Sequence, residues 1–147
     1  MDRETAIKRI REALGKRLLS IEEKSPSRVF LEVAPETVTE VSDLMIGEIG
    51  ARFQIASGVD TPAAMEVLYH WALDGAGCVV TVRTSLDREA PEIDSIVPVC
   101  AAAEWIEREM WELLGIQFRN HPDLRHLLLS DDWPEGKYPL RRDYTRE

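Results

Sequence analysis

The chain has 147 residues, of which 44% are hydrophobic and 31% are charged, and these proportions are usual for one globular domain with its own core. Its formal net charge of −9 argues against nucleic acid or an anionic lipid surface as the partner, because both require a basic face. Cys78 and Cys100 stand alone and are expected to be buried small side chains, and no apolar run approaches the length of a membrane span, so a cytoplasmic protein is the default expectation.

The N-terminal third of the chain predicts a helix, a strand and a second helix. Asp2 is suited to cap the first helix, in which apolar residues recur at spacings of three and four, at Ile7, Ile10, Leu14 and Leu18. The segment from Arg28 to Val33 alternates as a strand does. Pro35 suits the first turn of a second helix, which is expected to end at Gly47 or Gly50.

The middle of the chain predicts a strand over residues 52–59 followed by a hairpin. Residues 61–73 fit a helix, since Thr61-Pro62 is a fair helix start, but their aromatic and β-branched residues also alternate with polar ones. A glycine-bearing turn at 74–77 and an apolar run over 78–83 come next. We therefore interpret 61–83 as two strands joined by a tight turn.

A loop over residues 84–98 and a last helix over 99–114, ended by Gly115, complete the expected elements. Their order along the chain predicts an α+β fold, with helices packed on one face of a mostly antiparallel four-stranded sheet. The core domain is expected to comprise residues 1–118, and residues 119–147 are expected to form an extended C-terminal docking arm.

Glu109 is the unexpected residue of the last helix. Its spacing from Trp105, Ile106 and Met110 places its carboxylate on the apolar stripe, where an unpaired charge costs several kcal/mol. We expect Glu109 to be buried against an arginine of the arm, drawn from Arg125, Arg141 and Arg142. A general acid with a raised pKa is the alternative.

Other charged and imidazole side chains have simpler interpretations. Glu104, Arg108 and Glu112 follow i, i+4 spacing and are expected to form a solvated ladder of ion pairs. His121 and His126 are five residues apart, which is a poor spacing for a metal pair on a helix. We expect His121 to be a turn residue that makes one hydrogen bond.

The arm combines charge with aromatic anchors and has few periodic apolar residues. Trp, Tyr and Arg dominate the energetics of protein interfaces, so the arm is predicted to dock on a partner, with folding back on its own domain as the alternative. The predicted interface comprises Glu107, Arg108, Glu109, His121, Pro122, Asp123, Arg125, Asp131, Asp132, Trp133, Tyr138, Arg141, Arg142, Asp143 and Tyr144.

The chain resembles the 30 kDa subunit family of respiratory complex I, which is shared with energy-converting membrane-bound nickel–iron hydrogenases. The motifs that carry the resemblance are Glu107-Arg108-Glu109, Gly115-Ile116, Phe118, His121-Pro122-Asp123-Leu124-Arg125, Leu127-Leu128-Leu129, Asp131-Asp132-Trp133, Glu66-Val67-Leu68-Tyr69-His70 and the ending Tyr138-Pro139-Leu140-Arg141-Arg142-Asp143-Tyr144. The resemblance to this family is specific over about residues 65–144. Met110-Trp111-Glu112 departs from the family pattern and suits the hydrogenase type as well as the quinone-reducing type.

The resemblance implies a subunit without cofactor or metal, located on the cytoplasmic side of the membrane in the peripheral arm of an oxidoreductase complex. Its implied partners are the hydrogenase-like large subunit and an iron–sulfur small subunit. A free-standing ferredoxin-like module that regulates an enzyme or binds a small molecule is the alternative. A hydrolase using Glu107 or Glu109 is disfavoured, because residues two apart on a helix point in different directions. The electron acceptor, the ion pumped and the subunit stoichiometry stay open.

Overall fold

The structure is a computed structural model that describes residues 1–146, and its first helix begins at the predicted cap. In α1 (Arg3–Leu14) the Asp2 carboxylate accepts a hydrogen bond of 2.8 Å from the Thr5 N–H. A short turn, η1 (Gly15–Arg17), leads into β1 (Leu18–Ser25), a strand that the sequence analysis did not predict. β1 is mostly exposed and lacks an alternating pattern, so only its antiparallel pairing with β2 (Arg28–Val33) identifies it as a strand.

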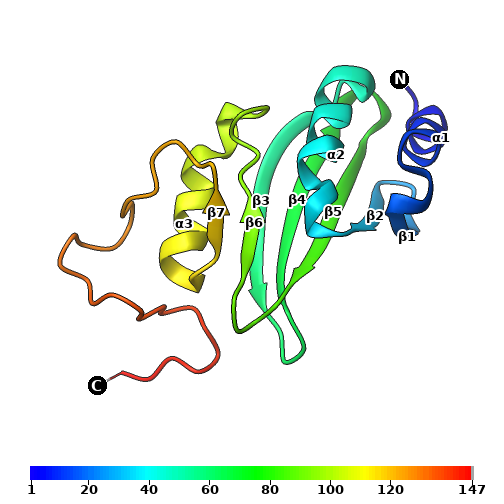
Figure 1. Cartoon of the computed structure of the whole chain (residues 1–147). Coiled ribbons are helices and arrows are strands. Elements are labelled where there is room, and N and C mark those ends of the chain that lie inside the picture. The colour runs from blue at the N-terminus through cyan, green and yellow to red at the C-terminus, as the bar shows by residue number, and fades with distance from the viewer. Residues whose placement is uncertain (147) are drawn as a thin grey trace.

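The central sheet is mixed and has five strands in the order β1-β2-β5-β4-β3 (Figure 1). β3 (Arg52–Asp60), β4 (Met65–Leu73) and β5 (Cys78–Leu86) form an antiparallel meander, which confirms the predicted hairpin. β2 pairs with β5 in parallel. The prediction of a four-stranded sheet was therefore wrong, because β1 adds a fifth strand beside β2. The parallel pairing arises because the chain crosses from β2 to the far edge of the sheet before β5 returns beside β2.

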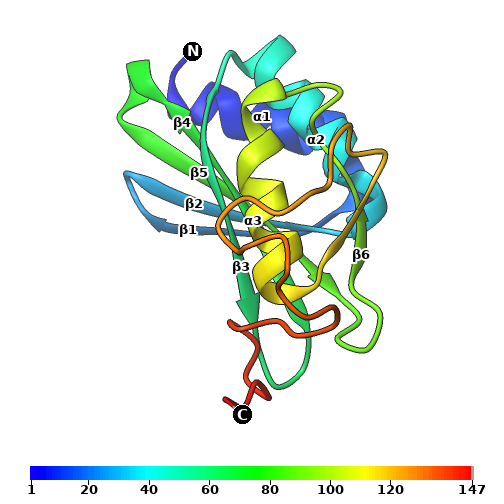
Figure 2. The same ribbon diagram turned by 90° about the vertical axis from the view of Figure 1, so that its left-hand side faces the viewer.

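One face of this sheet forms the core with the helices. Along β4, Val67, Tyr69 and Trp71 are 0% exposed, and each alternates with a partly exposed residue of the opposite face. The second helix follows β2 as predicted: η2 (Pro35–Thr37), α2 (Val38–Leu44) and the wider turn η3 (Met45–Ile49) end at Gly50, whose φ of 71° suits a helix stop. Figures 1 and 2 show the helices on the same side of the sheet.

The segment after β5 is more ordered than the predicted loop. Before β5, the turn η4 (Asp74–Ala76) joins β4 to β5. After β5, the short strand β6 (Glu92–Asp94) pairs in parallel with β7 (Gln117–Arg119). Between them, η5 (Ala101–Ala103) leads into α3 (Glu104–Leu114). A three-residue strand such as β6 carries almost no periodic signal and depends on β7 for its definition.

The arm continues from β7 without a further helix or strand in residues 120–146. Each residue from Asn120 to Arg146 keeps some exposed surface when backbone and side chain are taken together. Glu147, with which the predicted arm ends, lies outside the described residues. Figure 2 shows the arm crossing α3 before it turns towards the end of the sheet. Within residues 1–146, no helix has the length and apolar character that crossing a membrane requires.

Candidate functional site

α3 turns its charged residues inwards and part of its apolar side outwards. Glu107, Arg108 and Glu112 are 0%, 4% and 2% exposed, whereas Trp105 is 67% exposed. Burying three charged residues on one short helix is costly unless each has hydrogen-bond partners. The partners come from two loops: residues 95–96 before the helix, and the arm after it.

The prediction that Glu109 is buried against an arm arginine is wrong. Glu109 is only half-buried, and two of the three expected cations are engaged elsewhere: Arg125 pairs with Asp123, and Arg141 donates to the Leu114 carbonyl. An apolar stripe marks the buried side of a helix only when the helix has a single covered side facing one apolar neighbour. In the structure the arm covers a second side, and the helix is rotated so that Glu109 lies at the open side.

Glu107 is the buried carboxylate of α3, in place of Glu109. It accepts a hydrogen bond of 2.5 Å from the Ser95 hydroxyl and one of 3.0 Å from the Ile96 N–H. Burial raises its pKa to about 7, against the lowering effect of these two bonds. The fully buried ring of His121 lies 4.0 Å away, and the charge of Glu107 adds to burial in raising the pKa of Tyr69. This sealed environment gives Glu107 a structural role.

Arg108 and Glu112 hold the start of the arm by its backbone. Arg108 donates from Nε to the Arg125 carbonyl at 3.0 Å and from Nη2 to the His126 carbonyl at 2.7 Å. Glu112 accepts from the N–H groups of residues 127–129 and lies 3.1 Å from His126 Nδ1. The predicted solvated ladder is thus wrong for these two residues, because the unpaired backbone of the arm requires charged partners on the helix.

His121 fixes the bend between β7 and the arm with two hydrogen bonds, one more than predicted. Its Nε2 lies 3.0 Å from the Glu104 carbonyl, and its Nδ1 accepts from the Asp123 N–H at 3.0 Å. With Nδ1 as the acceptor, Nε2 is the ring nitrogen placed to donate to the Glu104 carbonyl. Pro122 lies in this bend, and the ion pair of Asp123 with Arg125, at 2.7 Å, faces solvent.

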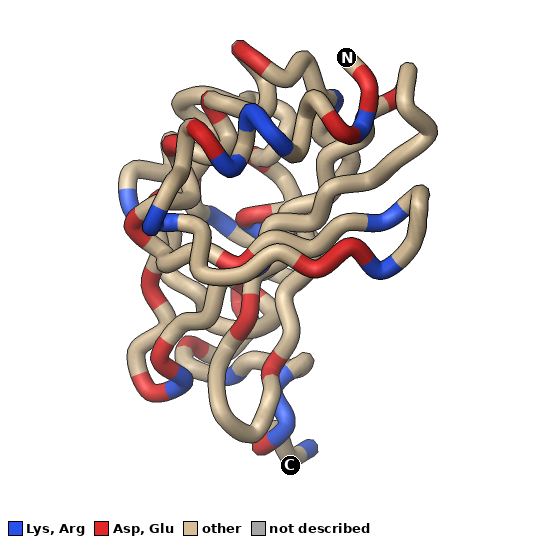
Figure 3. Tube along the Cα trace, turned by 90° about the vertical axis from the view of Figure 1, so that its right-hand side faces the viewer, with Lys and Arg blue, Asp and Glu red and all other residues tan. Residues whose placement is uncertain are grey.

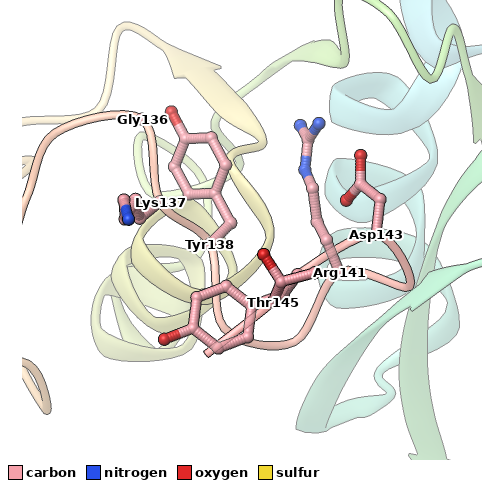
Figure 4. Close-up of a pocket in the computed structure, with 7 residues that line it drawn as sticks. Gly136, Lys137, Tyr138, Arg141, Asp143 and Thr145 are labelled. Atoms are coloured by element: carbon pink, nitrogen blue, oxygen red, sulfur yellow. The ribbon is translucent and has the colours of Figure 1, made fainter. Parts of the chain in front are cut away.

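The last part of the arm returns to the C-terminal end of α3. The Leu140 N–H donates to the Leu113 carbonyl at 3.0 Å, and Arg141 Nε donates to the Leu114 carbonyl at 2.6 Å. These bonds satisfy carbonyls that the helix itself leaves without partners. The Arg141 guanidinium also lies 4.8 Å from the Tyr138 ring centre, and both side chains line a small pocket of about 230 Å³ (Figure 4).

Asp60, at the end of β3, joins the arm to the sheet. Its side chain is 2% exposed, pairs with Arg88 at 2.7 Å and accepts from the Arg142 N–H at 2.9 Å. The hydrogen bond from Arg88 is the main cause that lowers the pKa of Asp60. The same hydrogen bond is the main cause that raises the pKa of Arg88, and the charge of Asp143 adds to this effect. Arg142 and Asp143 were among the predicted interface residues, whereas Asp60 and Arg88 were not, because no local motif marks them.

The acidic and aromatic segment of the arm is held mainly by its own turns. The Trp133 ring N–H donates to the Lys137 carbonyl at 2.7 Å, and the Ser130 hydroxyl donates to Asp132 at 2.5 Å. The predicted interface residues therefore fall into three groups. Glu107 and Arg108 are buried inside the subunit, and Tyr144 is half-buried. The exposed members are Pro122, Arg125, Asp131, Asp132, Arg142 and Asp143.

Two general features limit the chemistry of the described residues. Within residues 1–146, no group of three or more His, Cys, Asp and Glu side chains is arranged to hold a metal ion. Cys78 and Cys100 are free and buried, as predicted, and burial raises the pKa of the Cys100 thiol. Acidic and basic residues are interspersed along the chain, as Figure 3 shows, so the charge pattern suits contacts with a protein.

Comparisons with known proteins give one family. A model described as the 30 Kd subunit of respiratory-chain NADH dehydrogenase matches residues 31–147. A subunit of the F(420)H(2) dehydrogenase of Methanosarcina mazei is 40% identical over 124 residues, which are 82% of this chain and 78% of that protein. A subunit of the NADH-quinone oxidoreductase of Salinispora tropica is 33% identical over 121 residues, which are 78% of this chain but 49% of that protein.

Two solved structures share the fold. The trypsin-resistant fragment of Nqo5 superposes with a TM-score of 0.68 and 24% identity, over 81% of this chain and 99% of the fragment. A chain of the membrane-bound sulfane sulfur reductase, an archaeal respiratory membrane complex, superposes with a TM-score of 0.82 and 22% identity, over 97% of this chain and 85% of that chain. The chain belongs to the family of the 30 Kd subunit of respiratory-chain NADH dehydrogenase.

Proposed function

We propose that this chain is a peripheral subunit of a complex I-like respiratory complex and carries no redox cofactor of its own. The observation that carries the proposal is the family match over residues 31–147, together with 40% identity to a subunit of the F(420)H(2) dehydrogenase over most of both chains. The subunit supports electron transfer by holding its neighbours in place.

Its neighbours, in this proposal, are the hydrogenase-like large subunit and an iron–sulfur subunit. The arm supports this assignment, because its backbone is tied to α3 while some of its apolar side chains face outwards. Leu128 and Leu140 are 63% and 61% exposed, although their own N–H groups donate to the helix. Exposed apolar side chains on an ordered segment are typical of a surface that a partner covers.

The proposal leaves the electron donor and acceptor of the complex open among those for which its relatives are named. The relatives are named for NADH and quinone, for F(420)H(2) and, in the case of Escherichia coli formate hydrogenlyase subunit 5, for formate and hydrogen. That last protein is 45% identical over 69 residues, which are only 12% of its length. The complex is proposed to lie on the cytoplasmic face of the membrane and to couple electron transfer to ion pumping.

Purification of the intact complex tests the proposal. A tag on the chromosomal copy, mild detergent extraction and mass spectrometry should recover this chain in a constant ratio with a large subunit and an iron–sulfur subunit. A large subunit with two Cys-x-x-Cys pairs would indicate a nickel–iron hydrogenase type. Recovery of the chain only as a free monomer, from membrane and soluble fractions alike, would instead support a free-standing regulatory or ligand-binding module.

A matched pair of variants tests the outward face of the arm within the same experiment. Leu128→Ser should reduce recovery of the complex several-fold, since Leu128 is 63% exposed on the arm. Leu19→Ser serves as the control, because Leu19 is 61% exposed on β1 and far from the arm in sequence. Equal loss of complex with both variants would mean that the arm has no special part in assembly.

A further inference from the structure

The two edges of the central sheet differ in a way that points to a partner. β1 and β3 are the outer strands, so each has one side without a neighbouring strand in residues 1–146. β1 carries Glu22, Glu23 and Lys24, and its pairing with β2 is interrupted by two register shifts. Charges and irregular pairing are the means by which natural sheets prevent further strands from adding to an edge.

β3 has a single register shift, between Phe53 and Ile55, and lacks protective charges between its two ends. Its two terminal charges are already engaged, Arg52 with Asp74 and Asp60 with Arg88, each at 2.7 to 2.8 Å. The seven residues between them, 53–59, contain no charged side chain. Ile55 and Val59, which lie on the face of the sheet away from the helices, are 48% and 43% exposed. A long uncharged edge with exposed apolar side chains readily accepts another strand.

The other side of β3 borders an apolar groove on α3. The groove has a volume of about 170 Å³ and is lined by Gly58, Ile106, Glu109, Met110 and Leu113, with Leu140 of the arm among its walls. Gly58 lets the helix approach closely, since a Cβ there would lie 2.4 Å from the Leu114 Cδ1. Trp105, on the same open side of the helix, is 67% exposed.

We propose that β3 receives an extended segment of a partner subunit as a sixth strand of the sheet. This inference rests on the proposed function. Side chains alternate across a strand, so those on one side of the added segment would enter the groove beside Ile106 and Leu113. Those on the other side would cover Ile55 and Val59. The segment is therefore mostly apolar on both faces.

Glu109 specifies one further feature of the occupant. Its carboxylate lines the groove and makes no ion pair with a described residue, so a Lys or Arg of the added segment would complete it. A second copy of this chain is a poorer occupant, because residues 53–59 offer no cation to Glu109 and each copy has a net charge of −9. The added strand thus belongs to a different subunit and carries a basic residue.

Lysine substitutions at the two sheet edges test the proposal in the complex purified as above. Ile55→Lys with Val59→Lys should lower the recovery of the complex at least tenfold, because a charged edge resists strand addition. Leu19→Lys, on β1, is the matched control and should leave recovery unchanged. All variants are first compared as isolated chains by thermal unfolding, and a set of Ile55→Thr and Val59→Thr is used if the lysine pair does not fold.

Hydrogen exchange and charge reversal supply the independent readouts. Amides of β3 should exchange at least tenfold more slowly in the complex than in the isolated chain, whereas amides of β1 should not change. Glu109→Lys should weaken assembly, and Glu109→Gln should weaken it less. Normal assembly of the β3 variants, or unchanged β3 exchange in a complex that contains the chain, would overturn this inference and leave the proposed function intact. Slow β3 exchange that depends on the concentration of the chain alone would overturn it in favour of self-pairing.

Discussion

Glu107 is the residue whose charge state we expect to have the clearest effect on the stability of the subunit. Burial raises its pKa from the ordinary value of 4.5 to about 7 in the folded chain. Between these values the folded carboxyl keeps a proton that the unfolded carboxyl has lost. The free energy of unfolding therefore contains a contribution that falls as the pH rises from about 4.5 to about 7 and then stays constant. At about 1.4 kcal/mol per pH unit, this loss amounts to about 3 kcal/mol.

Glu107→Gln isolates this contribution. The glutamine carbonyl is suited to accept from the Ile96 N–H, as Glu107 does, and the glutamine amide can donate to the Ser95 hydroxyl oxygen in place of the bond that Glu107 accepts from Ser95. Wild type and variant should thus have free energies of unfolding within about 0.5 kcal/mol of each other near pH 4 to 5. Near pH 8 the variant should be the more stable by up to about 3 kcal/mol, because it carries no charge to bury.

Urea unfolding of the isolated chain, followed by circular dichroism across this pH range at constant ionic strength, measures the difference. Glu109→Gln is the control, since Glu109 is half-buried and forms no ion pair within residues 1–146, so the variant should differ from wild type by no more than about 0.5 kcal/mol. If Glu107→Gln were instead destabilised near pH 8 and neutral near pH 5, the carboxylate would be held as a stabilised anion, and the reasoning from burial would be refuted.

Three further expectations concern the arm and the composition. Glu112→Gln should lower the free energy of unfolding by about 1–3 kcal/mol and speed hydrogen exchange at residues 127–129, because the carboxylate accepts from their N–H groups. Burial raises the pKa of Glu112 and these bonds lower it, and the net effect is a lowered pKa. The stability that the Glu112 carboxylate contributes is therefore present above the ordinary value of 4.5 and is lost as the pH falls through the folded pKa. Gly115→Ala should cost about 1–2 kcal/mol or more in urea unfolding, since its φ is 77° and a Cβ would lie 2.6 Å from the Tyr138 ring; a Gly115→Ala variant as stable as wild type would show that the arm moves aside freely. The purified chain should show no redox absorbance and bind no metal stoichiometrically, and iron or zinc near one per chain in metal analysis would contradict this.

Local sequence determined most of the elements because their ends carry specific chemistry. Asp2 caps α1, Gly50 and Gly115 stop the second and third helices in the left-handed conformation, and the alternation of β2 matches its bounds. β1 and β6 escaped prediction because their definition depends on a partner strand more than on their own side chains. The parallel pairing of β2 with β5 is likewise a property of how the chain crosses the sheet.

The family motifs and the absence of cluster-binding cysteines were also visible in the sequence, whereas the roles of the charged residues on α3 were not. A helical stripe predicts one covered side, yet α3 contacts the core, the arm and solvent on different sides. Because the arm has many backbone groups and few apolar side chains, it is held by Arg108 and Glu112, and those charges are buried. Glu109 and Trp105 are left at the open side. Sequence thus determined which side chains α3 carries, and only tertiary packing decided which of them the protein buries, because burial depends on neighbours that are distant along the chain.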